Sequence, residues 1–489
     1  MLDRLVQYLG ERRPADRCHR LDQRVLHQVY GLTKKEKPDL MPCLGKSVGM
    51  KKGKTRFGGF IRSPSRLDQH FHVRAPLRIG SALLDHLLGA GQTVARASQP
   101  RPSLRRLNLH REACVRSDLL SSQRPNRLVC NLTAVADNLA ALRRAIRPGT
   151  RVFAALKGNA YGFGLHQVAA TLAQAGVDGI AVADQAEAVS LRQRGIRIPI
   201  LLYAGHLASR ETVAATLEHN LVPTLVEAGE AAEYSRLAER PIDVFVKVDV
   251  GLERLGVPAE QAADFVSRVR RLPRLQVCGL YTHLHVPANV SDEFLRWQLG
   301  RFDAVVAALA KSGEPLPMRM VASSASLVQA RGIEYDAVDP GGMLFGSAGA
   351  AAPRLELGVR PVLHAITSRL LQVKTVTPPR YPELAPYAWR PGLRIGVLPL
   401  GTCDGLHHFN AGRVLIRGRA AAIVGPISIE HVRVDVTDIV DAAPGDEAVI
   451  VGRQGELEIP FSEVMVHCGH RRLADLAMAV APTVARVSA

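Results

Sequence analysis

The feature that most constrains the fold is a regular alternation of short apolar runs and helical stretches, which begins at residue 126. Runs such as RVFAAL (151–156) and GIAVAD (179–184) have the length and composition of buried strands, and helical stretches such as AVADNLAALRRAI (134–146) alternate with such runs along the chain. About eight strand and helix units in roughly 220 residues are typical of a parallel barrel. The sequence therefore predicts an α/β fold with a (β/α)8 TIM-type barrel over residues 126–355, and RLVCNL (127–132) is its first expected strand.

The helical pattern ends near residue 356. The segments AITSRLLQVKTV (365–376), LRIGVLPL (393–400) and DEAVIVG (446–452) are rich in strand-forming residues and are separated by Pro, Gly and Asp. We therefore expect a second, mostly β domain over residues 356–489.

The segment before the barrel differs from the rest in charge. Residues 1–125 contain 25 Lys and Arg against 10 Asp and Glu, a net charge of +15, so only +3 of the total +18 belongs to the remainder. Little apolar periodicity accompanies this charge, which favours a disordered N-terminal extension. A loosely ordered appendage and a tether for nucleic acid or another acidic surface are the alternatives, and any nucleic-acid contact would be non-specific.

Composition also narrows the cellular context. No apolar run approaches about 18 residues and no secretory signal opens the chain. The seven cysteines are scattered without a C-x-x-C pair, which disfavours a zinc site and a disulfide framework. We expect a soluble, cytoplasmic protein with no membrane partner and no metal.

Candidate catalytic residues follow the predicted strands, where barrels place their chemistry. VFAALKGNAYGFG (152–164) puts one ammonium, that of Lys157, into a run of apolar, small and aromatic residues after the second expected strand. The other polar candidates are Lys247 and Arg254 after the sixth strand, His283 after the seventh and Ser324 after the eighth. The paired glycines of VDPGGMLFG (338–346) expose amides that suit a phosphate. A lysine facing a phosphate site favours a Schiff base with pyridoxal 5'-phosphate.

These motifs resemble those of the alanine racemase family. The resemblance covers about residues 126–460 and rests on ALKGNAYGFG, KVDVGLERLG, YTHLH, ASSASL, DPGGMLFG, PLGTCDG and GDEAVIVGRQG, in that order. It implies a pyridoxal-phosphate enzyme, an isomerase of D-amino acid metabolism, built from a barrel and a C-terminal β domain. It also implies a head-to-tail homodimer in which the β domain completes the partner's active site.

The resemblance assigns roles to individual residues. Lys157 matches the lysine that binds the cofactor and acts as one of two bases, and His283 matches the histidine that supports the second base. Arg254 matches the arginine near the cofactor and the substrate carboxylate, and Lys247 matches a lysine beside it that is often carbamylated. The phosphate contacts correspond to Tyr161, Ser324, Gly341 and Gly342.

The sequence departs from the family pattern at three positions. Thr402 stands where the family has its second catalytic base, a tyrosine, and its hydroxyl is too weak an acid to replace a phenol. Asp339 stands where the family has an arginine at the pyridine nitrogen, and a carboxylate there favours the pyridinium and a stronger electron sink. Ile429, followed by Glu430, replaces a Met-Asp pair that helps to hold the substrate carboxylate. Cys403, next to Thr402, is expected to be a small apolar filler.

Three functions remain open at this stage. The first is a pyridoxal-phosphate-dependent racemase that interconverts L- and D-amino acids, alanine by resemblance. The second is a one-base enzyme, either a β-hydroxy amino acid aldolase or a transaminase, because Thr402 replaces the tyrosine. The third is a cofactor-binding protein without catalytic activity.

Overall fold

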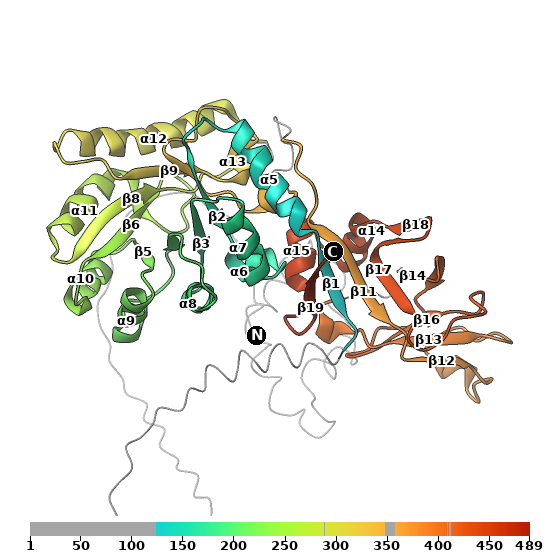
Figure 1. Ribbon diagram of the computed structural model, residues 1–489. Coiled ribbons are helices and arrows are strands. Elements are labelled where there is room, and N and C mark those ends of the chain that lie inside the picture. The colour runs from blue at the N-terminus through green and yellow to red at the C-terminus, as the bar shows by residue number, and fades with distance from the viewer. Residues whose placement is uncertain (1–123, 288, 348–356, 408, 410–411) are drawn as a thin grey trace, which may run out of the picture. The chain divides into compact units, whose positions relative to one another are not determined.

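The computed structural model describes residues 124–287, 289–347, 357–407, 409 and 412–489 (Figure 1). All of them belong to one compact unit, Ser103–Ala489. The basic segment 1–125 lies outside the described residues except for its last two, so its expected disorder stays a prediction.

Eight parallel strands in the described part of the chain form a closed barrel. Their order is β5-β4-β3-β2-β10-β9-β8-β6, and pairing of β5 with β6 closes it. The strands are β2 (Arg151–Ala155), β3 (Gly179–Val182), β4 (Ile200–Leu202), β5 (Val222–Leu225), β6 (Ile242–Asp249), β8 (Leu275–Tyr281), β9 (Met318–Ala322) and β10 (Ala337–Val338). A short strand, β7 (Val257–Pro258), pairs with β6. The predicted (β/α)8 barrel is confirmed.

Burial explains why these segments form strands. The four residues of β3 and the three of β4 are all buried, as expected for parallel strands covered on both faces. One buried cluster takes a residue from each of seven barrel strands: Phe153, Ala181, Leu201, Phe245, Tyr281, Met320 and Ala337. Gly279 makes room for this packing, because a Cβ there would lie 2.1 Å from the Phe245 ring.

Helices surround the barrel (Figure 1). They are α5 (Leu132–Ala145), α6 (Lys157–Tyr161), α7 (Leu165–Gln174), α8 (Gln185–Gln193), α9 (Arg210–Glu218), α10 (Ala228–Leu237), α11 (Ala259–Arg271), α12 (Asp292–Ala310) and α13 (Ser324–Leu327), with a 3-10 turn, η2 (Gly342–Phe345). Side-chain N-caps begin several of them, for example Asn131 at α5 and Asp184 at α8.

The strand expected to open the barrel lies elsewhere. β1 (Arg127–Cys130) pairs antiparallel with β11 (Leu363–Arg369) and parallel with β19 (Ala485–Ser488), so it belongs to the sheet of the second domain. The eighth barrel strand is instead the two-residue β10, which follows β9 and pairs with β2. The prediction was wrong here because a short apolar run does not reveal which distant strand it will pair with.

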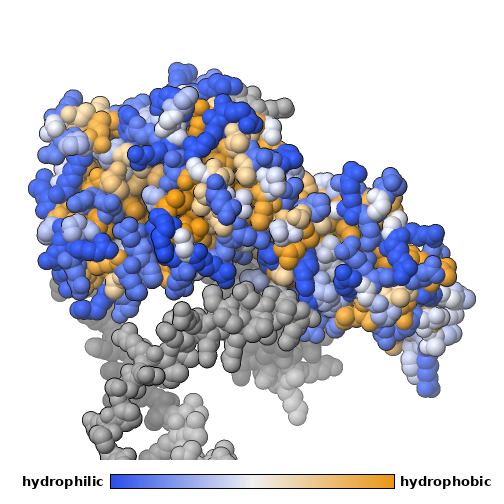
Figure 2. Space-filling view, viewed as in Figure 1, coloured by the Kyte–Doolittle hydropathy of each residue, from blue (hydrophilic) through white to orange (hydrophobic). Residues whose placement is uncertain are grey.

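The second domain is mostly β, as predicted. Its larger sheet has the order β15-β14-β17-β11-β1-β19, with β18 on β17, and a smaller sheet has the order β12-β13-β16. The remaining elements are β12 (Gln372–Thr375), η3 (Pro382–Leu384), β13 (Arg394–Leu398), η4 (Thr402–Asp404), β14 (Arg413–Ile416), β15 (Arg419–Ala422), β16 (Val432–Asp435), β17 (Glu447–Gln454), β18 (Leu457–Ile459), α14 (Phe461–Cys468) and α15 (Leu473–Ala479). Figure 2 shows hydrophobic as well as hydrophilic residues at the surface of this domain.

Two features of the described residues bear on the functional class. None of their helices is long and apolar enough to cross a bilayer. They also contain no group of three or more His, Cys, Asp and Glu residues placed to hold a metal ion.

Candidate active site

The carboxyl ends of the barrel strands bring most of the predicted site residues to one end of the barrel. Because β1 lies outside the barrel, Lys157 follows the first barrel strand rather than the second. The other expected strand positions shift by one in the same way: Lys247 and Arg254 belong to the fifth strand and its loop, His283 to the sixth and Ser324 to the seventh. Asp339 follows the eighth strand, β10.

The backbone after Lys157 adopts an unusual left-handed turn. Gly158, Asn159, Ala160 and Tyr161 have φ values of 64°, 55°, 54° and 55°. Left-handed geometry costs a residue with a Cβ about 1–2 kcal/mol, so neighbouring contacts must hold this turn in place.

Contacts on both sides of this turn hold it. The Asn159 amide donates to Glu187 Oε1 at 2.6 Å, and Asn159 Oδ1 accepts from the amide of Leu165 at 2.8 Å. The next residue, Gly162, contacts α15, since a Cβ there would lie 2.3 Å from the carbonyl oxygen of Ala477. These contacts therefore fix the backbone from which the Lys157 side chain extends.

Lys157 is an amine in a site that disfavours its charge. Burial lowers its pKa, the carboxyl of Asp339 opposes that shift, and the cation of Arg254 adds to it. The Nζ atom lies 5.4 Å from the centre of the Tyr203 ring. A lysine with a lowered pKa has a larger neutral fraction near neutral pH, which a base or a nucleophile requires.

Asp339 is a buried carboxyl group, with 6% of its surface exposed. The Tyr203 hydroxyl donates to Oδ2 at 2.9 Å, whereas Oδ1 is buried and has no hydrogen-bond partner. Burial raises the pKa of Asp339 to about 7, although Tyr203, Lys157 and Lys247 each pull it down. An unpartnered buried carboxyl oxygen is costly, so Oδ1 is placed for a group that the protein itself does not supply.

The predicted phosphate contacts converge beside this carboxyl. The backbone amides of Gly341 and Met343 both donate to Ser324 Oγ, at 2.9 and 3.1 Å. A Cβ on Gly341 would lie 2.2 Å from the Tyr161 hydroxyl, so only glycine fits there. Gly342 starts η2 directly behind these groups. The two amides donate to Ser324 Oγ and so fix the position of this hydroxyl, beside Tyr161.

The charge of Lys157 also lowers the pKa of two other predicted site residues, Lys247 and His283. Burial lowers the pKa of Lys247 to about 8, and Arg254 adds to the shift. Burial also lowers the pKa of His283 to about 4, with the charges of Lys157, Lys247 and Arg254 adding to it. His283 is therefore neutral at neutral pH. The charges of Lys157, Lys247 and Arg254 thus act on one another and on His283.

The loop that carries Arg254 is organised by Asp249. The Asp249 carboxylate accepts four backbone N–H groups, from Gly251, Leu252, Glu253 and Arg254, at 2.8 to 3.1 Å. Burial alone would raise the pKa of Asp249, but these donors hold it below its usual range. Arg254 itself is exposed, so its guanidinium is available to an anion at the mouth of the barrel.

The second-domain candidates lie on a separate loop. Buried Asp404 holds η4, because its Oδ2 accepts the amide of Gly401 at 2.8 Å and its Oδ1 pairs with Arg124 at 3.1 Å. Thr402 is half-buried, Cys403 is exposed and Ile429 is 71% exposed. The expectation that Cys403 fills an apolar gap is therefore wrong.

This loop is not joined to the barrel site. Among the described residues, no hydrogen bond or ion pair connects Thr402, Cys403 or Ile429 with Lys157, Asp339 or His283. Their expected roles in catalysis and substrate binding stay predictions.

Two residues of the site were not recognised from the sequence. Tyr203 holds Asp339, and Glu187 holds the left-handed turn through the Asn159 amide. Glu187 has one buried oxygen without a partner, Oε2, and burial raises its pKa against the pull of that amide. Tyr203 ends the apolar run IPILLY, and this position at a strand end was the available signal.

Comparison with known proteins agrees with this arrangement. The family model of the alanine racemase N-terminal domain matches residues 130–349, and that of the C-terminal domain matches residues 365–487. The alanine racemase of Synechocystis sp. is 31% identical over 334 residues, which cover 67% of this chain and 89% of the relative. That of Syntrophobacter fumaroxidans is 32% identical over 351 residues, 69% of this chain and 91% of the relative.

A crystal structure of alanine racemase from E. faecalis gives the same result. It has a TM-score of 0.66 and 25% identity, and the match covers 75% of this chain and 98% of that one. These relatives do not favour a one-base enzyme or a non-catalytic cofactor-binding protein. With both domain models matched in order and a barrel end that gathers the motif residues, the chain belongs to the alanine racemase family.

Proposed function

We propose that this protein is a pyridoxal-phosphate-dependent amino-acid racemase, with alanine as the substrate that the names of its relatives indicate. The observation that carries the proposal is the pairing of two groups at the barrel mouth. Lys157 is an amine whose pKa is lowered by burial, and Asp339 offers a buried carboxyl oxygen that has no partner in the protein.

The residues at the barrel mouth fit the cofactor chemically. The Lys157 amine suits its aldehyde, and Asp339 Oδ1 suits a protonated ring nitrogen. Ser324, Tyr161 and the backbone at Gly341 and Gly342 suit its phosphate, because the Ser324 and Tyr161 hydroxyls lie together beside the glycine pair and can donate to phosphate oxygens. Tyr203 acts here as a positioning residue, since it fixes one Asp339 oxygen and leaves the other free.

The proposed reaction moves one proton at the substrate Cα. When bound, pyridoxal phosphate withdraws electrons from an amino acid joined to it and so acidifies the Cα–H bond. Lys157 removes or returns that proton on one face, which its lowered pKa favours. Exposed Arg254 binds the substrate carboxylate. His283, which is neutral at neutral pH, supports the group that acts as the second base.

Racemisation also needs a proton on the opposite face. The Thr402 hydroxyl is a poor acid at neutral pH, so a phenol at this position would supply the proton far better. Cys403, next to it on η4, has an exposed thiol. We assign this proton to the loop around Thr402, with Ile429 beside the substrate.

We infer that the loop acts on a second copy of this chain, in a head-to-tail homodimer. Within one copy, no hydrogen bond or ion pair of the described residues joins the loop to Lys157. A large apolar side chain, Ile429, is exposed beside it and would be covered in such a dimer.

The test is incubation with L- and D-alanine in D2O, followed by NMR for Cα exchange and by chiral separation for configuration. A racemase converts each enantiomer into the other and incorporates deuterium in the product. Lys157→Ala should abolish exchange and inversion, whereas Lys374→Ala, an exposed lysine of β12, should leave both unchanged. Exchange of a single enantiomer without inversion would contradict the proposal and indicate a one-base reaction.

A further inference from the structure

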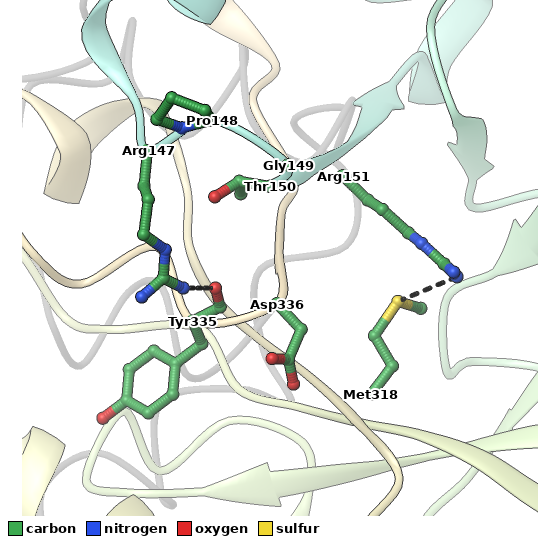
Figure 3. A pocket seen from close by; sticks show the side chains of 8 residues that line it. All are labelled: Arg147, Pro148, Gly149, Thr150, Arg151, Met318, Tyr335 and Asp336. Carbon is green, nitrogen blue, oxygen red and sulfur yellow. Dashed lines mark hydrogen bonds between the residues drawn. The ribbon is translucent and has the colours of Figure 1, made fainter.

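A pocket lies at the opposite end of the barrel from Lys157. It has a volume of about 420 Å³ and is lined by Arg147, Pro148, Gly149, Thr150, Arg151, Met318, Tyr335 and Asp336 (Figure 3). Arg151 and Met318 are the first residues of β2 and β9, and Asp336 directly precedes β10. The pocket is therefore formed at the amino ends of strands whose carboxyl ends carry the candidate active site.

A turn shapes one wall of the pocket. The sequence Arg147-Pro148-Gly149-Thr150 forms a β-turn in which the Thr150 amide donates to the Arg147 carbonyl at 3.2 Å and Gly149 has a φ of 85°. Proline at the second position and a positive φ at the third are typical of a type II turn. The turn brings Arg147 and Thr150 to the same pocket.

The charged side chains that line the pocket are two arginines, Arg147 and Arg151, and one carboxylate, Asp336. Figure 3 shows Arg147 and Arg151 on opposite sides, with Thr150 and Asp336 between them. Asp336 is already neutralised from outside the pocket, since Arg319 Nε and Nη2 bind its two oxygens at 2.7 and 2.8 Å.

Neither lining arginine forms an ion pair with a carboxylate of the described residues, although the charge of Arg147 helps to lower the pKa of Asp336. The Arg151 guanidinium donates to a sulfur, Met318 Sδ, at 3.8 Å, and Arg147 Nη2 donates to the carbonyl of Tyr335. Two guanidinium groups thus line the pocket without an ion pair to any carboxylate that the structure describes.

An independent observation also indicates a missing ligand. Thr150 is 4% exposed, and its Oγ1 is buried with no hydrogen-bond partner. A buried hydroxyl without a partner is destabilising unless something in the pocket accepts its proton. Together with the two guanidinium groups, it gives the pocket more hydrogen-bond donors than its own acceptors occupy.

We propose that this pocket binds a dianionic phosphate group, either free phosphate or that of a small phosphate monoester. Guanidinium groups bind phosphate oxygens through paired, charge-assisted hydrogen bonds, and a threonine hydroxyl donates to a third oxygen. The volume leaves room for a small organic group beside the phosphate. This site is separate from the cofactor's phosphate contacts and does not depend on the proposed reaction.

The experiment is calorimetric titration of the full chain, saturated with pyridoxal phosphate and then desalted, so that the barrel mouth is occupied. The probes are glycerol 3-phosphate, inorganic phosphate and glycerol. We expect the two phosphates to bind and glycerol not to bind. Tighter binding of glycerol 3-phosphate assigns the pocket to a monoester, and equal binding assigns it to free phosphate.

Matched variants locate the binding. Arg151→Gln should weaken binding about tenfold or more, because it removes a charge-assisted pair. Thr150→Val should weaken binding by a smaller factor, and it should fold because it removes only an unpartnered hydroxyl. Arg296→Gln, an exposed arginine of α12 with the same change in charge, should bind like the parent protein. No binding of either phosphate at millimolar concentration, or unchanged binding by both Arg151→Gln and Thr150→Val, would overturn the proposal.

Discussion

At the scale of single residues, the site depends on charges placed where burial disfavours them. Asp339 and Lys157 each have a pKa shifted towards the neutral form, and each is partly stabilised by the other. Such shifts are concentrated at functional sites because a base must exchange protons near the working pH. Tyr203 belongs to the same group, since its hydroxyl fixes the orientation of the Asp339 carboxyl.

The Asp339 carboxyl makes the stability of the cofactor-free protein depend on pH. Its pKa is raised to about 7 in the folded state, against about 3.9 in an unfolded chain. Between these values the folded state binds more protons, so this carboxyl lowers stability as the pH rises from about 4 to 7. As the pH rises from about 5 to about 8, we expect the free energy of unfolding of Asp339→Asn to increase by about 1–3 kcal/mol relative to that of the parent protein. Urea unfolding of both proteins at several pH values measures the difference in their free energies of unfolding. A difference that stays constant with pH would contradict this prediction.

Thr402 controls the second proton transfer in the proposed reaction. Replacing Thr402 by Tyr introduces a phenol, and a positioned acid or base contributes about 100-fold or more to a proton transfer. We expect Thr402→Tyr to racemise alanine at least about tenfold faster than the parent protein, allowing for imperfect placement. Thr402→Phe is the control because it adds the ring without the hydroxyl. Equal rates for the two variants would show that the phenol does not reach the substrate.

At the scale of elements, the left-handed turn after Lys157 is a strained segment held by its surroundings. Its geometry is stabilised by Asn159 on one side and by the close approach of Gly162 to α15 on the other. This contact connects the turn after Lys157 to α15 of the second domain. A change in the packing of α15 should therefore alter the position of Lys157.

A pair of glycine substitutions measures this contact. Gly162 and Gly176 have similar φ values, 86° and 79°, but a Cβ at Gly176 would meet no atom within 4 Å. Gly176→Ala should cost about 1–2 kcal/mol from backbone strain alone. Gly162→Ala should cost at least about 1 kcal/mol more, because its methyl group meets the backbone of α15. Thermal unfolding of the two variants gives the comparison, and equal losses would mean that α15 moves away freely.

Local sequence patterns predicted where the strands and helices lie better than they predicted which strands pair with one another. The barrel was predictable because each buried strand and its helix is encoded by neighbouring residues. β1 was misplaced because RLVC has no local mark of the strands it pairs with, and β10 was missed because it has only two residues. The motif around Lys157 indicated the site, but Tyr203 reaches Asp339 only through the barrel's closure, which no short segment contains.

At the scale of the whole molecule, we propose that two copies of the chain together complete the site. The loop with Thr402 and Ile429 lies in the second domain, whereas Lys157 lies in the barrel. A head-to-tail pair would bring each loop to the other copy's barrel and would cover exposed Ile429. Association and activity are then coupled.

This coupling can be measured with a charge placed in the loop. Ile429→Arg should weaken self-association and lower racemisation together by about tenfold or more, since burial of an unpaired charge is costly. Val466→Arg, at an equally exposed apolar residue of α14, serves as the control. Light scattering over a range of protein concentrations reports association. A monomeric parent protein with full activity would contradict the homodimer.

The position of β1 makes the barrel an insertion within the second domain. β1 precedes the barrel in the chain, yet both of its neighbours, β11 and β19, follow it. On a ribosome, β1 therefore emerges early and has to wait with both edges unpaired until the barrel and β11 have been made, and with one edge unpaired until β19 has been made. Bringing such distant strands together is slow, and an unpaired strand is open to misassociation in the meantime. A circular permutant that carries β1 after β19 would remove this delay, and a fragment that starts at β11 would lack β1, the strand that joins β19 to the rest of the sheet.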